Sequence, residues 1–273
     1  MPPSDALPHA NGIQWDPHQY RKFAHHRLRP ALELLSRIPL PSPRVICDLG
    51  CGSGTVTRLL AERWPRAKVY GIDNSPQMLA QARGCATGIH WLEADIASWS
   101  PPVRPDLVYS NAALHWVDNH AQLFPRLFGM LPSGGCLAVQ MPLSWSAPSH
   151  RLMRETLMDG GTMGSALGSD ALRRSISRNW TESAGTYYDL LAEASEHLDI
   201  WETEYLQVLE GENPVLEWVK GTGLRPILEG LDDRDREIFL QSYSARLQQA
   251  YPARPDGRTL YPFRRLFLVA VRA

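Results

Sequence analysis

The sequence contains few cysteines and no long apolar run. Four of its 273 residues are cysteine, and their spacing matches no metal-binding pattern, so we expect buried reduced thiols and no metal site. No apolar segment approaches the roughly 20 residues that a membrane helix requires. The first fourteen residues are polar and contain proline, without the apolar region of a secretory signal. These absences exclude a membrane-spanning protein and favour a cytoplasmic one.

The sequence also lacks an excess of charge of either sign. It has 28 Lys and Arg residues against 29 Asp and Glu residues, for a net charge of −1. Proteins that bind nucleic acids or membrane surfaces usually carry a basic excess, so we expect a small-molecule partner instead. With 44% hydrophobic residues, the chain can form one sizeable core with a smaller attached region. We expect a monomer or a weak dimer.

Short apolar runs alternate with amphipathic segments in the first half of the chain. The segments between the runs have helical periodicity, and Ser75 followed by Pro76 is typical of a helix start. Strands that are apolar on both faces favour a parallel sheet covered on both sides, which is a doubly wound, Rossmann-like α/β fold. The runs that predict strands are 44–50, 67–73, 89–95, 105–114 and 134–141.

The alternation stops after Met141. Residues 199–209 and 263–273 predict two late strands that would join the far edge of a mostly parallel seven-stranded sheet, with the last strand antiparallel. Residues 214–228 and 232–251 each predict a helix, and residues 20–36 predict one or two helices with a break at Pro30. We therefore divide the chain into a tail (1–14), a ligand-binding core (15–142, 196–210 and 259–273) and a helical cap (143–195 and 211–258).

Three glycines follow the first predicted strand in the pattern D-x-G-x-G-x-G, at Gly50, Gly52 and Gly54. In a doubly wound sheet, ligands bind beyond the carboxyl ends of the strands, where this turn lies. A nicotinamide-binding loop would require a further glycine where Thr55 or Thr57 stands. The turn is therefore suited to a ligand that presses on the backbone without a pyrophosphate.

Two acidic residues end the next two predicted strands. Asp73, 19 residues after Gly54, could accept hydrogen bonds from ribose hydroxyls, although it could also cap a helix. Asp95 could accept from an adenine amino group, with Ile96 and Met78 packing on the ring, although both apolar residues could be core residues. The glycine turn and the two acids, on three successive strands, together predict a nucleoside-binding site.

The segments DLGCGSG, GIDNSPQML, EADI and NAALHW resemble successive motifs of class I S-adenosylmethionine-dependent methyltransferases. The resemblance implies S-adenosylmethionine as the cofactor, with the glycine turn lining its methionine part and Asn111 near the methionine end. The residues that it implies for cofactor binding are Asp48, Gly50, Gly52, Gly54, Asp73, Asn74, Met78, Asp95, Ile96, Asn111 and Arg29.

Most of residues 15–273 further resemble the trans-aconitate 2-methyltransferase family, most specifically in the segments TYYDLLAEA and EWVKGTGLRPIL. This resemblance implies a methyl ester formed on a carboxylate of a small polycarboxylic acid such as trans-aconitate. Residues 155–183 depart from the family pattern, and a loop there would flank the substrate.

Arginines are the side chains expected to hold such an acid. A carboxylate with a pKa of about 4 is already ionised at neutral pH and needs no general base, while the planar guanidinium matches a carboxylate with two hydrogen bonds. The candidates are Arg225 and Arg265, the latter preferred to Arg264 because strand neighbours point in opposite directions. Arg27 and Arg29 could instead hold the cofactor's own carboxylate.

Two further side chains have possible catalytic roles. The hydroxyl of Tyr188, or of its neighbour Tyr187, could donate to the substrate, and packing is an equally good reason for both rings. His115 follows the fourth predicted strand, where it could bond the substrate or act as a base.

Three alternatives to ester formation stay open. A methyltransferase acting on a phenol, an amine or a carbon acid could use His115 as its base. A nicotinamide oxidoreductase is disfavoured by the glycine pattern. A methyltransferase-fold module could also bind its ligand without turnover.

Overall fold

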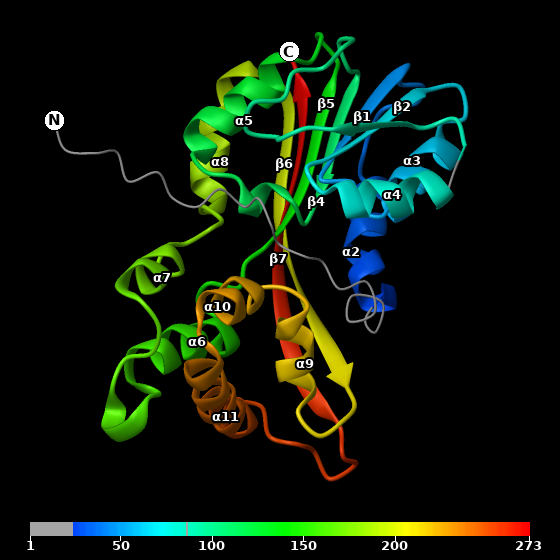
Figure 1. Ribbon diagram of the computed structural model, residues 1–273. Helices are drawn as coiled ribbons and strands as arrows, with labels where there is room; N and C mark the ends of the chain where they lie inside the picture. The colour runs from blue at the N-terminus through cyan, green and yellow to red at the C-terminus, as the bar shows by residue number, and fades with distance from the viewer. Residues whose placement is uncertain (1–23, 86) are drawn as a thin grey trace, which may run out of the picture. The chain divides into compact units, whose positions relative to one another are not determined.

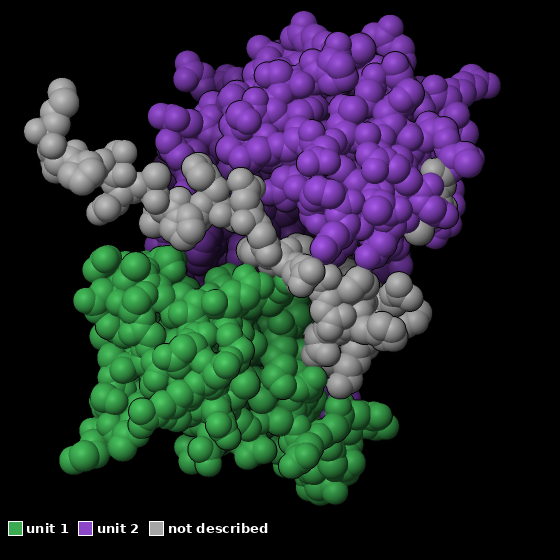
Figure 2. All heavy atoms as spheres, viewed as in Figure 1, with its two compact units in different colours: residues 1–23, 148–177, 210–259 green, residues 24–147, 178–209, 260–273 purple. Residues whose placement is uncertain are grey.

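The computed structural model describes residues 24–85 and 87–273, so the predicted tail lies outside the described residues. Contacts divide the chain into two compact units, shown in different colours in Figure 2. Unit 2 contains residues 24–147, 178–209 and 260–273, and it holds the sheet.

The sheet of unit 2 has seven strands in the order β3-β2-β1-β4-β5-β7-β6 (Figure 1). The first five of these pair in parallel, and β7 is antiparallel to β5. The predicted Rossmann-like sheet with an antiparallel last strand is confirmed, and its strand order reverses beside β1, where ligands bind in such folds. The strands are β1 (Val45–Leu49), β2 (Lys68–Asp73), β3 (His90–Glu93), β4 (Leu107–Asn111), β5 (Cys136–Pro142), β6 (Ser195–Leu209) and β7 (Thr259–Arg272).

Helices cover both faces of the sheet. On one face, here called the α2 face, α2 (Ala24–Ser36) and α3 (Thr55–Arg63) pack against strand residues that include Tyr109 and Ala138. On the other, the α5 face, α5 (His120–Gly129) and α8 (Ala184–Leu191) pack against Val108 and Val139. Because neighbouring strand residues enter opposite clusters, the central strands are apolar on both sides, as predicted.

Helix α2 is continuous through Pro30, so the predicted break is wrong. Proline within a helix typically costs about 3 kcal/mol, because it removes a hydrogen bond and crowds the preceding turn. Here Ala31, Leu34 and Leu35 are buried against the sheet, and the Tyr109 hydroxyl donates to the Ala31 carbonyl at 3.0 Å. Packing of this face offsets the local cost.

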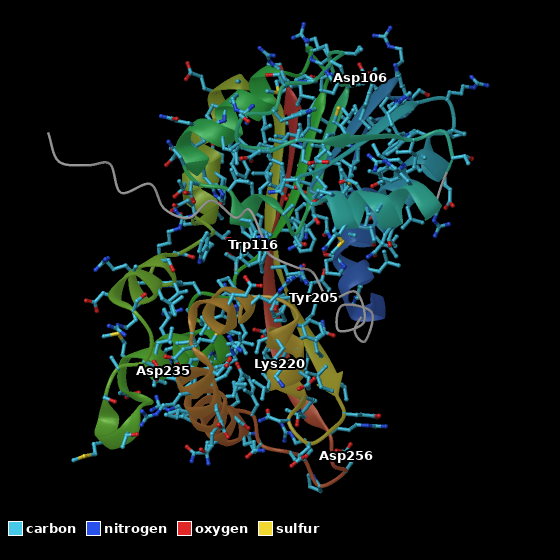
Figure 3. All side chains as sticks on the ribbon, viewed as in Figure 1. Asp106, Trp116, Tyr205, Lys220, Asp235 and Asp256 are labelled. Carbon is cyan, nitrogen blue, oxygen red and sulfur yellow. The ribbon has the colours of Figure 1, made fainter. Side chains whose placement is uncertain are left out.

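Helix α4 (Pro76–Cys85) begins as predicted, because the Ser75 hydroxyl accepts a hydrogen bond from the Met78 N–H at 3.3 Å. At the opposite end of the sheet, the Asp106 carboxylate accepts from the N–H groups of Arg44 and Val45 at 2.7 and 3.0 Å. Figure 3 labels Asp106 at this amino end of the strands and Trp116 near the carboxyl end.

Helix α8 belongs to unit 2, although the sequence assigns residues 143–195 to the helical cap. Tyr187 on α8 is fully buried, with its ring centroid 4.5 Å from that of Phe124 on α5. Its hydroxyl lies 2.7 Å from Nδ1 of the buried His120 and accepts from the Glu182 N–H at 3.0 Å. These contacts hold α8 on α5 and explain Tyr187 as a packing residue.

The described part of unit 1 is helical and contains residues 148–177 and 210–259. The N–H of Ser149 donates to the Tyr251 hydroxyl at 3.0 Å, and the Tyr243 hydroxyl donates to the Ser149 carbonyl at 2.9 Å. No helix of the described residues is long and apolar enough to cross a membrane. The helices of unit 1 are α6 (Pro148–Asp159), α7 (Asp170–Ser175), α9 (Pro214–Lys220), α10 (Arg225–Gly230) and α11 (Asp233–Ala250).

The single helix predicted over residues 214–228 is wrong, because α9 ends at Lys220 and α10 begins at Arg225. Two glycines, Gly221 and Gly223, lower the helix propensity of the intervening turn. Pro226 then fits the first turn of a new helix, where its missing N–H costs little.

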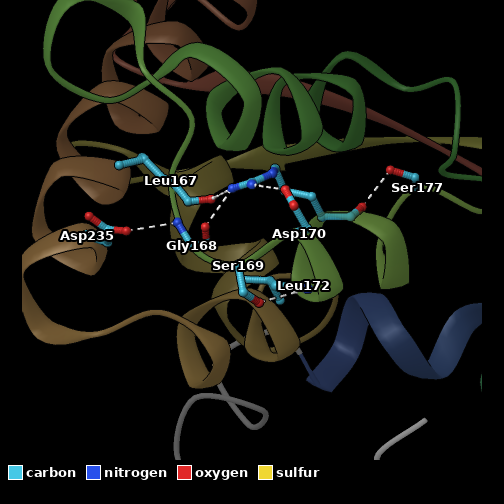
Figure 4. Close-up of polar contacts among 8 residues, drawn as sticks. Leu167, Gly168, Ser169, Asp170, Leu172, Ser177 and Asp235 are labelled. Atoms are coloured by element: carbon cyan, nitrogen blue, oxygen red, sulfur yellow. Dashed lines mark hydrogen bonds and ion pairs between the residues drawn. The ribbon is translucent and has the colours of Figure 1, made fainter. Parts of the chain in front are cut away.

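Helix α7 lies in the segment 155–183 that departs from the family pattern. Figure 4 shows that the Gly168 N–H donates to Asp235 at the start of α11, at 2.8 Å. Arg173 donates to the carbonyls of Leu167 and Gly168 at 2.7 and 2.6 Å. The segment preceding α7 is therefore attached to α11 by one backbone-to-carboxylate hydrogen bond and to α7 by the side chain of Arg173.

Candidate active site

The glycine turn connects β1 to α3 through left-handed backbone conformations. Gly50, Gly52 and Gly54 have φ values of 73°, 54° and 80°, which other residues rarely adopt. The N–H groups of Gly50 and Cys51 both donate to the Ile72 carbonyl, at 2.8 and 3.0 Å. The turn is thereby bent around the end of β2.

The loop after β4 packs directly on this turn. A Cβ atom at Gly50 would lie 2.1 Å from the Ala113 Cβ and 3.8 Å from Ile96 Cδ1. A Cβ atom at Gly52 would meet nothing within 4 Å. The structure therefore places Ile96 beside the turn, and it leaves open space at Gly52.

Asp73 ties the turn to α4. Its carboxylate accepts from the N–H of Gly52 at 2.8 Å and from the N–H of Ser75 at 2.9 Å. Burial raises the pKa of Asp73, and these backbone hydrogen bonds partly oppose that rise. Because each carboxylate oxygen can accept a second hydrogen bond, the predicted ribose contact is compatible with this structural role.

Asp48, at the carboxyl end of β1, is almost fully buried. Its carboxylate accepts from the Thr57 hydroxyl at 2.6 Å. Burial raises the pKa of Asp48 to about 7; the Thr57 hydrogen bond opposes the rise, and the nearby charge of Asp73 adds to it. The side chain is thus close to its midpoint of ionisation at neutral pH.

The residues predicted to hold the adenine follow β2 and β3. Asp95 is exposed, and its carboxylate accepts from the Ala97 N–H at 2.9 Å, so that it also shapes its own turn. Asn74 is exposed after β2, and Met78 is buried in α4. The predicted cofactor residues therefore follow the carboxyl ends of β3, β2, β1 and β4 in the order of the strands.

A row of polar side chains continues this edge on the α2 face. Asn111 and Gln140 are register partners on β4 and β5, so their side chains point to the same face. Arg265 on β7 is buried and donates from Nη1 to Gln140 Oε1 at 2.9 Å, while its guanidinium carbon lies 4.7 Å from the Phe263 ring centroid. Gln140 is not among the residues predicted from the sequence, although a glutamine inside the apolar run CLAVQM is a usable signal.

Arg264 points away from Arg265, as the strand alternation predicts. It is exposed and forms an ion pair with Glu202 on β6. Arg265 is consequently the member of the pair whose side chain is buried inside unit 2.

Glu33 of α2 is a second polar centre that sequence reasoning missed. Its carboxylate accepts from the Tyr205 hydroxyl at 2.5 Å, from Thr203 Oγ1 at 3.0 Å and from Trp201 Nε1 at 3.2 Å. Burial raises the pKa of Glu33, whereas these hydrogen bonds, above all the one from Tyr205, lower it. The net effect is a lowered pKa. The predicted cofactor ligand Arg29 is exposed and lies over the Tyr205 ring, 5.1 Å from its centroid.

His115 lies in a short 3-10 turn (Leu114–Trp116) after β4, and it is half-buried. Its ring centroid is 4.8 Å from that of Trp116. Tyr188 is 56% exposed on α8, in contrast to the buried Tyr187. The catalytic roles of His115 and Tyr188 stay predictions.

Arg225 belongs to unit 1, where it is the first residue of α10. Its guanidinium lies 3.6 Å from the carboxylate of Glu229. Two residues earlier, a Cβ at Gly223 would lie 3.0 Å from Nε2 of His150 on α6. Burial and the charge of Arg154 lower the pKa of His150 to about 4, so this ring, which sequence reasoning missed, is neutral.

The buried cysteines of unit 2 do not resemble metal ligands. Burial raises the pKa of Cys47 to about 12 and also raises the pKa of Cys51, which keeps both thiols protonated. Residues 24–85 and 87–273 contain no cluster of His, Cys, Asp or Glu that could hold a metal ion.

Comparison with known proteins identifies the family. Residues 46–135 match the model of a methyltransferase domain. The chain is 45% identical over 258 residues to the trans-aconitate 2-methyltransferase of Azoarcus sp., covering 94% of this chain and 99% of that protein. It is also 45% identical to the corresponding enzyme of Pseudomonas aeruginosa, covering 94% of each. The chain belongs to the trans-aconitate 2-methyltransferase family.

Solved structures agree with the fold. A putative methyltransferase from Bacillus halodurans aligns with a TM-score of 0.54 at 16% identity, covering 89% of this chain and 98% of that one. Phosphoethanolamine N-methyltransferase 2 of Haemonchus contortus, crystallised with S-adenosyl-L-methionine, aligns with a TM-score of 0.51 at 16% identity, covering 89% and 52%. The family predicted from the sequence motifs and its Rossmann-like fold are therefore confirmed.

Two alanine variants separate the effect of the close contact at Gly50 on stability from the effect of its left-handed backbone conformation. Gly50→Ala places a methyl group into Ala113 and is expected to lower the free energy of unfolding by about 3 kcal/mol or more, from overpacking and a strained φ together. Gly52→Ala carries the strained φ without the contact and is expected to cost about 1–2 kcal/mol. Urea unfolding of both variants measures the difference, and equal losses would contradict the packing argument.

The raised pKa of Asp48 predicts a specific pH dependence. The folded protein keeps the Asp48 proton up to about pH 7, whereas the unfolded chain releases it near 3.8. This contribution to stability is therefore lost as the pH rises through about 7. From pH 5.5 to pH 8, the gain in the free energy of unfolding from Asp48→Asn should grow by on the order of 2 kcal/mol, at about 1.4 kcal/mol per pH unit up to the folded-state pKa of about 7. Urea unfolding at both pH values, with the exposed Asp95→Asn as control, tests this; a gain independent of pH would contradict it.

Proposed function

We propose that this chain is an S-adenosylmethionine-dependent O-methyltransferase that forms a methyl ester on a carboxylate of a small polycarboxylic acid such as trans-aconitate. The names of its relatives at 45% identity support this proposal. The observation that carries it is the order of side chains along one sheet edge, from acids after β3 and β2 through the glycine turn to a buried arginine on β7. The cytoplasmic location and the monomeric or weakly dimeric state expected from the sequence are part of the same proposal.

The residues at this edge fit the cofactor. The open space at Gly52 leaves room against the turn, and Asn111 Oδ1 is buried without a hydrogen-bond partner among the described residues. We assign Asn111 and the turn to the methionine part, Asp73 to the ribose, and Asp95 to the adenine. When bound, S-adenosylmethionine supplies an electrophilic methyl group. Asn74, Met78 and Ile96 would line the nucleoside, and Arg29 would hold the cofactor's carboxylate.

The chain itself supplies position and charge. An ionised carboxylate needs no proton removed, so no acid-base pair is required. Arg265 is a buried cation, and its attraction for an anion is stronger there than in water because the surroundings are less polarisable. Correct positioning of two reactants can lower a barrier by roughly 7–11 kcal/mol at best. Within this scheme Tyr188 and His115 would orient the acid through hydrogen bonds.

The proposal is tested by incubating the purified protein with S-adenosylmethionine and a panel of di- and tricarboxylic acids, phenols and amines. We expect mass spectrometry to show a gain of one methyl group on a polycarboxylic acid, as a base-labile ester. Boiled protein is the control. Methylation of phenols or amines alone would favour His115 as a base, and donor binding without any product would favour a binding module.

Arg225 in unit 1 stays a sequence-based proposal for binding a substrate carboxylate. If it has that role, Arg225→Ala should raise the KM for the acid by about tenfold or more, through loss of a charge-assisted hydrogen bond. The affinity for S-adenosylhomocysteine, measured by calorimetry, should change by less than about twofold. Glu229→Ala controls for loss of the neighbouring ion pair. An unchanged KM in Arg225→Ala would remove Arg225 from the site.

A further inference from the structure

Gln140 is a completely buried polar side chain near the carboxyl end of β5, with 0% of its surface exposed. Its Oε1 accepts from Arg265 Nη1 at 2.9 Å, which fixes the orientation of the amide. Its Nε2 atom is buried and has no hydrogen-bond partner among residues 24–85 and 87–273. The amide thus presents two N–H donors that the described part of the chain does not satisfy.

Such a group is costly in a folded protein. A buried donor without a partner costs about 1–3 kcal/mol, and buried polar groups nearly always have partners. Holding Arg265 requires only a hydrogen-bond acceptor. A group with an acceptor and no buried N–H donor would hold the guanidinium equally well, without the cost of an unsatisfied amide. The unsatisfied donor therefore indicates a ligand.

The position of Gln140 along the sheet indicates which ligand. Neighbouring strands lie about 4.8 Å apart, so β5 is about 10 Å from β1, with β4 between them. Among the proposed cofactor residues that end or follow strands, the row ends at Asn111 on β4, and Arg265 lies beyond Gln140 on β7. Gln140 is consequently next to the cofactor row, on its side away from the nucleoside.

The hydrogen-bonding groups of Gln140 and Arg265 favour an anionic ligand. Oε1 of Gln140 already accepts from Arg265, its Nε2 can only donate, and a guanidinium has only donors. An amide N–H beside a buried cation matches a carboxylate oxygen. The Phe263 ring covers the guanidinium, and the hydroxyl of the nearby Tyr205 already donates to Glu33. The Gln140 amide therefore adds neutral N–H donors beside the charge of Arg265.

We propose that Gln140 is a specificity-determining residue that donates from Nε2 to a carboxylate of the acid substrate, while Arg265 supplies the positive charge. This inference rests on the proposed function, because it names how the same site recognises its acid. The cofactor also has a carboxylate, and the test below distinguishes the two.

Gln140→Glu is the decisive variant. It keeps an acceptor for Arg265 but removes the donor and adds a negative charge. We expect the KM for the best polycarboxylic acid to rise by at least about tenfold, with the affinity for S-adenosylhomocysteine unchanged within about twofold. Gln140→Met, which removes the donor without adding charge, should also raise the KM. Gln207→Met, at a buried glutamine on β6, is the matched control and should leave the KM unchanged.

A binding measurement separates this inference from the proposed function. The acid is titrated into wild-type protein saturated with S-adenosylhomocysteine, and the titration is repeated with both Gln140 variants. Weaker acid binding in the variants supports the inference even if wild-type protein makes no ester, in which case only the proposed function fails. Ester formation with a KM that Gln140→Glu and Gln140→Met leave unchanged overturns the inference and leaves the function standing. A loss of cofactor affinity with unchanged acid binding also overturns it, because the amide would then serve the cofactor's carboxylate. Absence of both acid binding and product in wild-type protein overturns both.

Discussion

The close contact between the glycine turn and the loop after β4 is the constraint on which the rest of the site depends. A side chain at Gly50 would collide with Ala113, so the backbone of the turn can lie against the end of β4 only because this position has no Cβ. Hydrogen bonds to the Ile72 carbonyl and to the Asp73 carboxylate hold the same turn on β2. Backbone contacts with both neighbouring strands therefore position the turn at the point where the strand order reverses.

The strand order then arranges the chemistry. Parallel strands bring their carboxyl ends to one edge, so residues that are distant in the chain become neighbours at a spacing of about 4.8 Å. Asp95 follows β3, Asp73 ends β2, Asn111 ends β4 and Gln140 lies near the end of β5. Arg265 joins this edge because β7 runs antiparallel to β5 and enters the sheet at that end. The acidic, amide and guanidinium groups that we assign to the nucleoside, to the methionine part and to the acid are thus placed along one edge.

Burial decides which of these polar groups are strongly perturbed. Asp48 is enclosed at the end of β1, and its pKa rises to about 7 despite the hydrogen bond from Thr57. Glu33 is also partly buried, yet three donors from β6 lower its pKa. Desolvation raises the pKa of both carboxyls, but the net shift is upward for Asp48 and downward for Glu33, because Glu33 accepts more hydrogen bonds in its charged form.

Local pattern was enough to predict the sheet, since apolar runs, the Ser75 helix start and the glycine turn depend on neighbours in the chain. Predictions from the local pattern were wrong where a contact between residues distant in the chain outweighed a local conformational preference. Pro30 stays within α2 because Ala31 and Leu34 pack on the sheet, and α8 joins unit 2 because Tyr187 reaches His120 and Phe124. The motifs likewise indicated the cofactor class, because each motif is a short segment at the end of a single strand.

The sequence by itself determined the fold class, the family and the identity of the cofactor, because strand periodicity and the motif spacings are properties of short segments. Only the tertiary structure decided that Gln140 holds Arg265 and retains a buried donor. The two residues are 125 positions apart, and their contact exists only because β7 inserts beside β5. The hydrophobic periodicity of the sequence cannot predict such a contact, because the contact depends on how the strands of unit 2 pair.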